Sequence, residues 1–284
     1  MCIRDRIYVS LAVGLNIIVG LCGLLVLGYI AFYAVGAYTY ALLNVHYGVN
    51  FFLCLPIGFL TGAVAGGLVG LPVLRLRGDY LAIVTLGFGE IVRIVLNNWD
   101  ELTAGPNGIM NIARPSLFGL KLGTTHGYYY LAALLAAAVM FTQTRLTGTK
   151  VGRAWEAIRE DELAAAHSGV PVFKMKMQAM MLGGAWAGAA GALFAARMTH
   201  VSPESFTFLE SVLVLCMVVL GGMGSVTGAT VGALLLIIVP ELLRGFSNFR
   251  MLGFGLVLVL MMRFRASGLI PSRRFRIREA EEGI

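Results

Sequence analysis

The chain has 284 residues, of which 58% are hydrophobic and only 13% are charged. About a quarter of the residues of an average soluble protein are charged, so this composition excludes an ordinary soluble domain and indicates a chain that spans a membrane. The formal net charge is +7 at pH 7. The basic residues lie beside apolar runs, which favours charge bias across a membrane and argues against nucleic-acid binding.

The first uncharged run occupies residues 7–43, which is too long for one span because a span needs about 20 residues. Gly20, Gly23 and Gly28 lie near its middle, so the sequence predicts two helices that meet there. Residues 1–6 resemble translated sequencing-adapter sequence, and a genuine basic start ahead of a signal-anchor helix is the alternative. On the first interpretation, we expect the natural N-terminus to contain a further apolar helix.

Three more spans follow in the first half of the chain. Residues 47–74 form an uncharged run that ends at a basic turn around Arg75. A span at 80–98 and another at 122–144 flank the polar, glycine-containing segment 100–126, which we predict to be a loop.

The second half contains one long charged stretch, 145–176, and four further spans. The first of these spans is 177–196. The uncharged run 211–240 is interrupted by glycines at 221–225, which predicts two short helices or a re-entrant pair. The last span, 246–264, is the weakest because basic residues flank it. The predicted fold class is therefore all-α, a polytopic transmembrane bundle of about nine spans with broken or re-entrant helices.

Basic residues also predict the orientation. The turn at Arg75, the stretch 145–176 and the C-terminal region hold most of the 22 Lys and Arg residues. Counting spans places all three on the same side, which the positive-inside rule assigns to the cytoplasm. We expect one transmembrane domain, 1–284, with a cytoplasmic coupling loop at 145–176 and a cytoplasmic tail at 265–284.

Small residues recur at every fourth position of two predicted spans, which places them on one face of each helix. Another helix can approach such a face closely, and close packing drives helix association in lipid. We interpret both faces as helix-packing surfaces, with a direct transport role as the alternative. The glycines concerned are Gly58, Gly62, Gly66, Gly70, Gly184 and Gly188.

Other glycines interrupt two apolar runs, one in each half of the chain. Unwound backbone persists at membrane depth only where protein or a water-filled cavity surrounds it. Paired interruptions of this kind mark the central site of secondary transporters, and by analogy we extend this rule to the present chain. The candidates for the substrate path are Gly23, Gly28, Gly36, Gly222 and Gly224.

Glu90 and Arg93 are two charged residues within the span at 80–98. Placing an ionisable residue inside a membrane costs free energy, so we expect this pair to have a structural or functional role. Their spacing of three allows an ion pair on one face of the helix. A structural pair, a place in the substrate path and a gating role all remain open.

The segment 152–170 within the charged stretch is rich in Ala and Glu, and Gly169 and Pro171 stop it, so it predicts one short helix. It is either a solvated connector or a docking helix for a cytoplasmic partner.

The sequence has no Gly-x-x-x-x-Gly-Lys-Ser/Thr loop for ATP, no His-Glu-x-x-His metal pair and no Gly-x-Ser-x-Gly elbow. We therefore expect no catalytic residue, no metal site and no cofactor in this chain.

Five segments resemble the LivM-type permeases of ABC importers for branched-chain amino acids, and two of them are long and mixed in composition. These two are LRLRGDYLAIVTLGFGEIVRIVLNNWDELTAGPNGI (74–109) and GRAWEAIREDELAAAHSGV (152–170). The other three are 14–39, 220–243 and 263–271. The sequence differs from the family at Tyr29, where a histidine is frequent, and at Gly228-Ala229, where Gly-Pro is common.

The resemblance implies a permease in a bacterial inner membrane that works with a second, related permease subunit. It also implies two cytoplasmic ATPases, which bind ATP and Mg, and a periplasmic substrate-binding protein. The segment 152–170 would be the helix that an ATPase receives, with contacts among Glu156, Glu160, Glu162, Ala165 and Gly169.

Three alternatives stay open. Some relatives carry urea or short amides instead of amino acids. A stand-alone, ion-coupled secondary transporter or channel would also explain the broken helices. A membrane-embedded enzyme would need a cluster of acids, bases or metal ligands, for which the sequence offers no motif.

Overall fold

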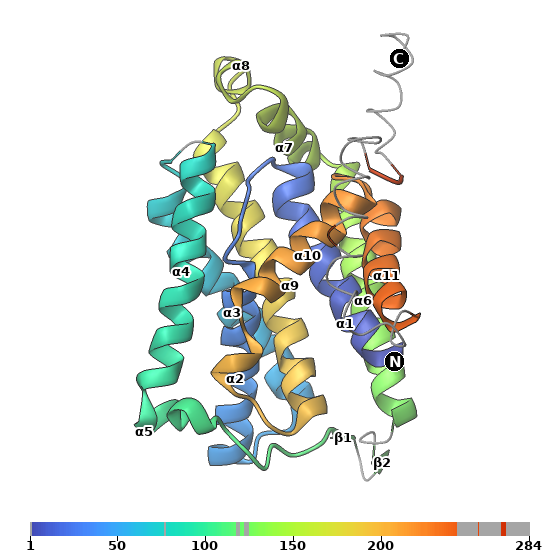
Figure 1. Cartoon of the computed structure of the whole chain (residues 1–284). Helices are drawn as coiled ribbons and strands as arrows, with labels where there is room; N and C mark the ends of the chain where they lie inside the picture. Colours follow the sequence, from blue (N-terminus) through green and yellow to red (C-terminus); the bar gives the residue numbers. More distant parts are fainter. Residues whose placement is uncertain are drawn as a thin grey trace.

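A computed structural model describes residues 2–76, 78–117, 120–121, 125–242, 255 and 268–270. These residues form a bundle of long helices, which confirms the predicted all-α class (Figure 1). The first half contains α1 (Cys2–Asn16), the π-helical turn η1 (Ile17–Leu21), α2 (Tyr29–Tyr47), α3 (Phe51–Val73), α4 (Asp79–Asn98), α5 (Asp100–Thr103), the 3₁₀ turn η2 (Gly105–Asn107), β1 (Ser116–Leu117) and β2 (Leu120–Lys121). The second half contains α6 (Thr125–Thr147), α7 (Lys150–Glu160), α8 (Glu162–His167), α9 (Val172–Met198), the 3₁₀ turn η3 (Pro203–Ser205), α10 (Phe208–Gly221) and α11 (Val226–Leu242).

Four described helical segments are long and apolar enough to cross a membrane, and one shorter apolar helix accompanies them. By length and composition, the four are Phe51–Val73, His126–Thr147, Val172–Met198 and Pro203–Gly221, and the shorter one is Val226–Ile238. All five fall at predicted spans. The predicted span 246–264, apart from Gly255, and the tail 265–284, apart from 268–270, lie outside the described residues.

Helix α9 is the central element of the bundle. Of its most apolar stretch 78% is buried inside the protein, against 28% for the corresponding stretches of α3 and α6. Alanine and glycine fill much of α9, and these small side chains let its neighbours approach closely. Helices α2 and α3 pack against α9, and α1 packs between α9 and α6.

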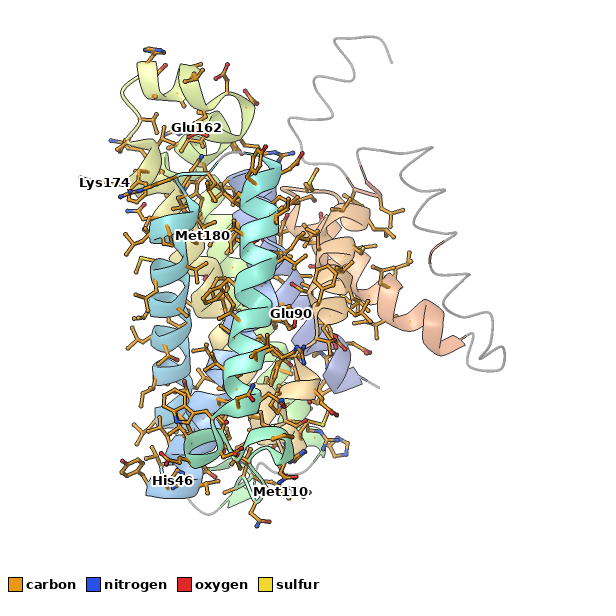
Figure 2. The ribbon with its side chains drawn as sticks, turned by 60° about the vertical axis from the view of Figure 1, so that its left-hand side comes forward. His46, Glu90, Met110, Glu162, Lys174 and Met180 are labelled. Carbon is orange, nitrogen blue, oxygen red and sulfur yellow. The ribbon has the colours of Figure 1, made fainter. Side chains whose placement is uncertain are left out.

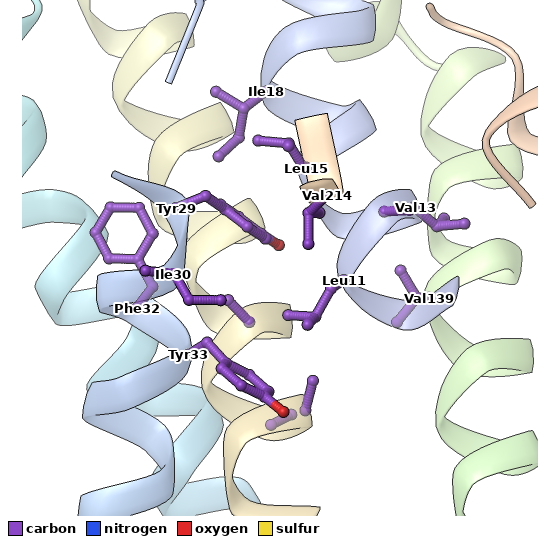
Figure 3. Close-up of a cluster of buried hydrophobic side chains, with 14 of the residues drawn as sticks. Leu11, Val13, Leu15, Ile18, Tyr29, Ile30, Phe32, Tyr33, Val139 and Val214 are labelled. Atoms are coloured by element: carbon purple, nitrogen blue, oxygen red, sulfur yellow. The ribbon is translucent and has the colours of Figure 1, made fainter. Parts of the chain in front are cut away.

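A buried apolar cluster surrounds α1, with α2 and α10 on one side of the helix and α6 on the other. Figure 3 shows Leu11 and Leu15 of α1 beside Tyr29 of α2 and Val214 of α10. Val139 of α6 joins the cluster from the other side of α1. The helix that begins the chain is therefore an internal element of the fold.

Two sequence predictions need correction. The segment 152–170 is two helices, α7 and α8, because Asp161 adopts an extended conformation between them. Its carboxylate accepts hydrogen bonds from the backbone N–H groups of Leu163 and Ala164 at 2.8 and 3.0 Å, which caps the start of α8. The segment 100–126 is also more than a loop, since it contains α5, η2 and the β1–β2 hairpin.

The bundle has two distinct ends. Helices α7 and α8 lie at one end, and α5 and the β1–β2 hairpin lie at the other (Figure 1). At the end opposite α7, Ile109 pairs with Val201 and so joins the segment after η2 to the connection between α9 and α10. The turn between α3 and α4 lies at the α7 end, as the predicted orientation of the Arg75 turn requires.

Candidate functional site

The repeated glycines lie where α2, α3 and α9 approach most closely. A Cβ atom at Gly62 would overlap the carbonyl oxygen of Gly184, and a Cβ at Gly184 would overlap that of Gly62. A Cβ at Gly188 would overlap the carbonyl oxygen of Gly58. We call this zone of close backbone contact among α2, α3 and α9 the glycine seam. Gly36, a candidate for the substrate path, lies in it, because an added Cβ there would meet the carbonyl oxygen of Gly188.

The seam loosens towards the α7 end. A Cβ at Gly66 would still meet the backbone of Met180, which Figure 2 labels in α9. At Gly70 the nearest atom would be the flexible side chain of Met177, 3.0 Å away. The closest backbone contacts therefore lie in the middle of α3.

The first helix break is the extended segment 22–28, which follows η1 and runs from beside α7 to the start of α2 (Figure 1). Two buried hydroxyl groups form hydrogen bonds with the backbone of Leu27 in this segment. The N–H of Leu27 donates to the hydroxyl oxygen of Thr85 in α4 at 3.1 Å, and Ser211 of α10 donates to the carbonyl oxygen of Leu27. Gly28 allows close approach of α4, since a Cβ there would overlap the carbonyl oxygen of Thr85.

The second helix break is the turn between α10 and α11. Gly224 has a φ of +83°, a conformation that favours glycine. Its N–H donates to the side-chain oxygen of Asn16 at 2.9 Å, and the Asn16 amide donates to the carbonyl oxygen of Ser225 at 3.2 Å. Asn16 is fully buried at the end of α1, so its side chain joins the helix that precedes the first break to the second break.

A short C-terminal segment also supports the second break. The N–H groups of Leu269 and Ile270 donate to the carbonyl oxygens of Leu220 and Gly221, at 2.9 and 3.0 Å. Gly222 follows with a φ of +120° and faces Gly268. The last carbonyls of α10 thereby gain hydrogen-bond donors that its own helix does not supply.

Arg159 of α7 contacts both breaks. Its guanidinium donates a hydrogen bond to the carbonyl oxygen of Gly20 in η1. The stem of the same side chain lies against Gly23, where a Cβ would be 2.9 Å from the Arg159 Cγ. A Cβ at Gly224 would be 3.0 Å from the Arg159 Nη1. The predicted coupling loop therefore reaches the backbone of both glycine-containing interruptions.

Two polar contacts fasten this loop to α9. The indole N–H of Trp155 donates to the carbonyl oxygen of Met175 at 2.7 Å. The Lys176 ammonium pairs with the Glu162 carboxylate at 2.6 Å, although only 6% of the Lys176 side chain is exposed. Helices α7 and α8 are thus both connected to the start of the central helix.

The other candidate coupling residues differ in their surroundings. Glu156 is half-buried, Glu160 is exposed and Ala165 is buried. Burial lowers the pKa of the Arg159 guanidinium, while the charges of Glu156 and Glu160 act in the opposite direction. Gly169 has a φ of +83° and nothing within 4 Å of the position that a Cβ would take.

A cavity of about 290 Å³ lies between the first break, the turn before α4 and helices α7 to α9. It combines apolar side chains with two cations and two carboxylates. The residues that line it are Cys22, Gly23, Leu24, Leu25, Leu76, Gly78, Asp79, Leu81, Ile158, Arg159, Glu162 and Lys176.

The Glu90–Arg93 pair lies partway along α4, away from Glu162 and the α7 end (Figure 2). The carboxylate and guanidinium are 2.8 Å apart, and about a third of each side chain is exposed, at 34% and 36%. The pair is formed within one helix, as the spacing predicts. In the part of the chain that the structure describes, no group of three or more His, Cys, Asp or Glu could hold a metal ion.

Four residues of this site were not predicted from the sequence, namely Asn16, Thr85, Ser211 and Arg159. Asn16 was visible as a polar residue inside an uncharged run, four positions before Gly20. Arg159 was visible inside the segment 152–170. Thr85 and Ser211 gave no signal, because single hydroxyl groups are common in membrane helices and their partner is defined only by the fold.

Comparison with known proteins identifies the family. The profile of the branched-chain amino acid transport system / permease component family matches residues 4–264. The permease protein LivM of the high-affinity branched-chain amino acid transport system of Escherichia coli is 52% identical over 94% of this chain and 68% of its own length, and the LivM protein of Salmonella typhimurium matches equally well. The probable LivM protein of Methanocaldococcus jannaschii is 27% identical over 78% of this chain and 68% of its own.

No solved structure matches the chain. The family profile covers both helix breaks and the segment 152–170, which carried the resemblance in the sequence. The chain belongs to the family of permease components of branched-chain amino acid transport systems.

Proposed function

We propose that this chain is one of two related permease subunits of an ATP-driven importer that moves branched-chain amino acids into the cytoplasm. A periplasmic binding protein delivers the substrate, and two cytoplasmic ATPases bind ATP and Mg and drive the change of state. The permease itself performs no chemistry on the substrate. It resides in the bacterial inner membrane, with 145–176 and the tail 265–284 in the cytoplasm.

The observation that carries this proposal is the contact between Arg159 of α7 and the carbonyl oxygen of Gly20 in η1. A driven permease needs a cytoplasmic surface that a partner can move and a route from that surface to the membrane helices. Helix α7 has such a surface, since Arg153 and Glu160 are exposed while Trp155 and Ile158 are buried. A stand-alone secondary transporter has no use for this arrangement.

The names of the relatives support the substrate class. The LivM proteins of Escherichia coli and Salmonella typhimurium are named for high-affinity transport of branched-chain amino acids, and both are 52% identical to this chain. Permeases for urea or short amides are the second candidate within the same family, because the binding protein sets much of the specificity.

Reconstitution tests the proposal. The permease, its sister subunit, the two ATPases and the binding protein are incorporated into liposomes, and uptake of radiolabelled leucine is measured with and without ATP. We expect ATP-dependent leucine uptake that excess isoleucine or valine competes away and urea or acetamide does not. The permease alone should give no ATP-dependent uptake. Leucine uptake by the permease alone, driven by an ion gradient, would support the secondary transporter instead.

A further inference from the structure

We propose that Arg159 is the positioning residue that transmits movement of the cytoplasmic helix α7 to the two helix breaks in the membrane domain. The inference deepens the proposed function and rests on it, since transmission requires a partner ATPase that moves α7. Arg159 touches no substrate in this scheme. It acts through the backbone of Gly20 and Gly224.

The first step is the end of η1. A helix leaves its last carbonyl groups without intrahelical donors, and these carbonyls carry the negative end of the helix dipole. Backbone N–H groups of Gly23 and Leu24 reach the carbonyl oxygens of Val19 and Ile18, at 3.2 Å each. The carbonyl of Gly20 accepts its hydrogen bond from the Arg159 guanidinium. A cation is therefore placed where the chain leaves the helix and becomes extended.

The second step is the turn between α10 and α11. A Cβ at Gly224 would lie 3.0 Å from both the Arg159 Nη1 and the Gly20 carbonyl oxygen, so the turn covers the hydrogen bond between them. Asn16, the last residue of α1 and the one before η1, binds Gly224 and Ser225. The two breaks thus form one hydrogen-bonded unit, and Arg159 is the cation inserted into it.

The third step is the geometry of α7. Trp155 and Arg159 are four residues apart and therefore lie on the same face of the helix. Trp155 is buried and donates to the carbonyl oxygen of Met175, which anchors one turn of α7 to α9. Arg159 lies one turn further along. Motion applied to the exposed face of α7 would therefore pivot on Trp155 and displace Gly20 through Arg159.

A purely structural role for Arg159 predicts a different effect of its replacement on coupling. If Arg159 only caps a helix, its loss would reduce stability and assembly but leave the ratio of transport to hydrolysis unchanged. The variant Arg159→Met keeps the apolar stem and removes every donor. Arg159→Lys keeps the charge and an ammonium group with three N–H donors, one of which is enough for a single carbonyl acceptor. Lys174→Met is the matched control, because it removes an exposed cation near the start of α9, outside the α7 surface assigned to the partner.

The test uses the complete reconstituted complex. For each variant, we measure the amount of ATPase that co-purifies, ATP hydrolysis with and without leucine-loaded binding protein, and leucine taken up per ATP hydrolysed. We expect Arg159→Met to assemble and hydrolyse ATP but to lose about tenfold in leucine taken up per ATP, as loss of a charge-assisted hydrogen bond predicts. Arg159→Lys should recover part of the coupling, because its ammonium group can still donate to the Gly20 carbonyl, and Lys174→Met should match the wild type.

Hydrogen exchange supplies a readout that does not depend on transport. In Arg159→Met, backbone amides of 20–28 and 222–225 should exchange faster than in the wild type and in Lys174→Met. Unchanged exchange in both segments, or an unchanged ratio of uptake to hydrolysis, would overturn the inference. Failure of both Arg159→Met and the milder Arg159→Gln to assemble would also overturn it, since that result assigns Arg159 a structural role.

These outcomes are separable from failure of the proposed function. If the wild-type complex takes up no branched-chain amino acid, the substrate proposal fails whatever the variants do. If the wild-type complex transports leucine and Arg159→Met does so with equal efficiency, only the inference about Arg159 fails.

Discussion

The side-chain oxygen of Asn16 accepts a hydrogen bond from the backbone N–H of Gly224 at 2.9 Å, although 208 positions separate the two residues. Asn16 ends the regular part of α1, and Gly224 lies in the turn between α10 and α11. One fully buried amide therefore joins two interruptions that lie in opposite halves of the sequence. The contact makes the paired glycine clusters a single structural feature.

Removal of this amide should destabilise the protein. In Asn16→Ala, the N–H of Gly224 and the carbonyl of Ser225 lose their partners, and a buried group left without a hydrogen bond costs about 1–3 kcal/mol. We expect a lower unfolding temperature in detergent, measured by the fluorescence of the native tryptophans. Asn98→Ala is the control, because Asn98 is exposed and donates only to the carbonyl of Ile94 in its own helix. Equal unfolding temperatures for the two variants would contradict the assigned role of Asn16.

The glycine seam should tolerate no side chain at its centre. In Gly62→Ala, the added Cβ would overlap the carbonyl oxygen of Gly184, which is backbone and cannot move aside cheaply. Overpacking of this kind costs about 1–3 kcal/mol, so we expect a lower unfolding temperature and less assembled complex. Gly67→Ala on the same helix is the control, since its Cβ would lie 3.5 Å from the flexible side chain of Met181. Full assembly of Gly62→Ala with altered substrate choice would show that the seam is part of the substrate path.

The sequence predicted the helices well because the bilayer core offers the backbone no hydrogen-bond partners. Every backbone group at membrane depth needs a partner, so long apolar runs form helices, and glycine clusters mark the interruptions. The division of 7–43 into two helices and the interruption of 211–240 follow from this rule and agree with the structure. The spacing of Gly58, Gly62 and Gly66 predicted a packing face for another reason, namely that small residues on one face let a neighbouring helix approach closely.

The contacts across the bundle could not be predicted from the pattern. Nothing in the periodicity says that Asn16 meets Gly224 or that Arg159 meets Gly20, because both pairs depend on how the helices are arranged in three dimensions. Gly36 shows the same limit, since its neighbourhood in the chain suggested the substrate path and the structure places it against Gly188. The division of 152–170 at Asp161 had a local signal in the capping preference of Asp, which the Ala- and Glu-rich composition outweighed.

The turn at Gly169 should matter for coupling through its backbone alone. Its φ of +83° favours glycine, and the surrounding space is open, so a larger side chain meets no steric obstacle. Gly169→Leu should cost about 1–2 kcal/mol in backbone strain and displace the end of α8. Gly169→Asn is the control, because asparagine adopts this conformation readily. We expect Gly169→Leu to lose leucine-stimulated ATP hydrolysis and uptake, whereas Gly169→Asn keeps both. Normal activity of Gly169→Leu would mean that the turn is a passive connector.

The ion pair between Glu162 and Lys176 should hold α8 against the start of α9. The two groups are 2.6 Å apart, and the Lys176 side chain is only 6% exposed, so its charge is poorly solvated without the carboxylate. Removing one member of a buried pair is strongly destabilising, at about 3–5 kcal/mol, and the 37% exposure of the Glu162 side chain reduces that cost here. Glu162→Lys should therefore detach α8 and lower both ATPase co-purification and leucine uptake.

Charge reversal separates this ion pair from a direct contact between Glu162 and the ATPase. If the pair itself is what matters, the double variant Glu162→Lys with Lys176→Glu should recover much of the uptake that Glu162→Lys loses, because the two charges attract again. If Glu162 instead binds the ATPase, the double variant should remain as defective as the single one. Glu160→Lys is the control for a change of charge at the exposed face of α7. It should leave α8 in place and alter only ATPase binding. Recovery in the double variant together with weakened ATPase binding in Glu160→Lys would assign Glu162 to the internal support of the loop and Glu160 to its outer contact surface.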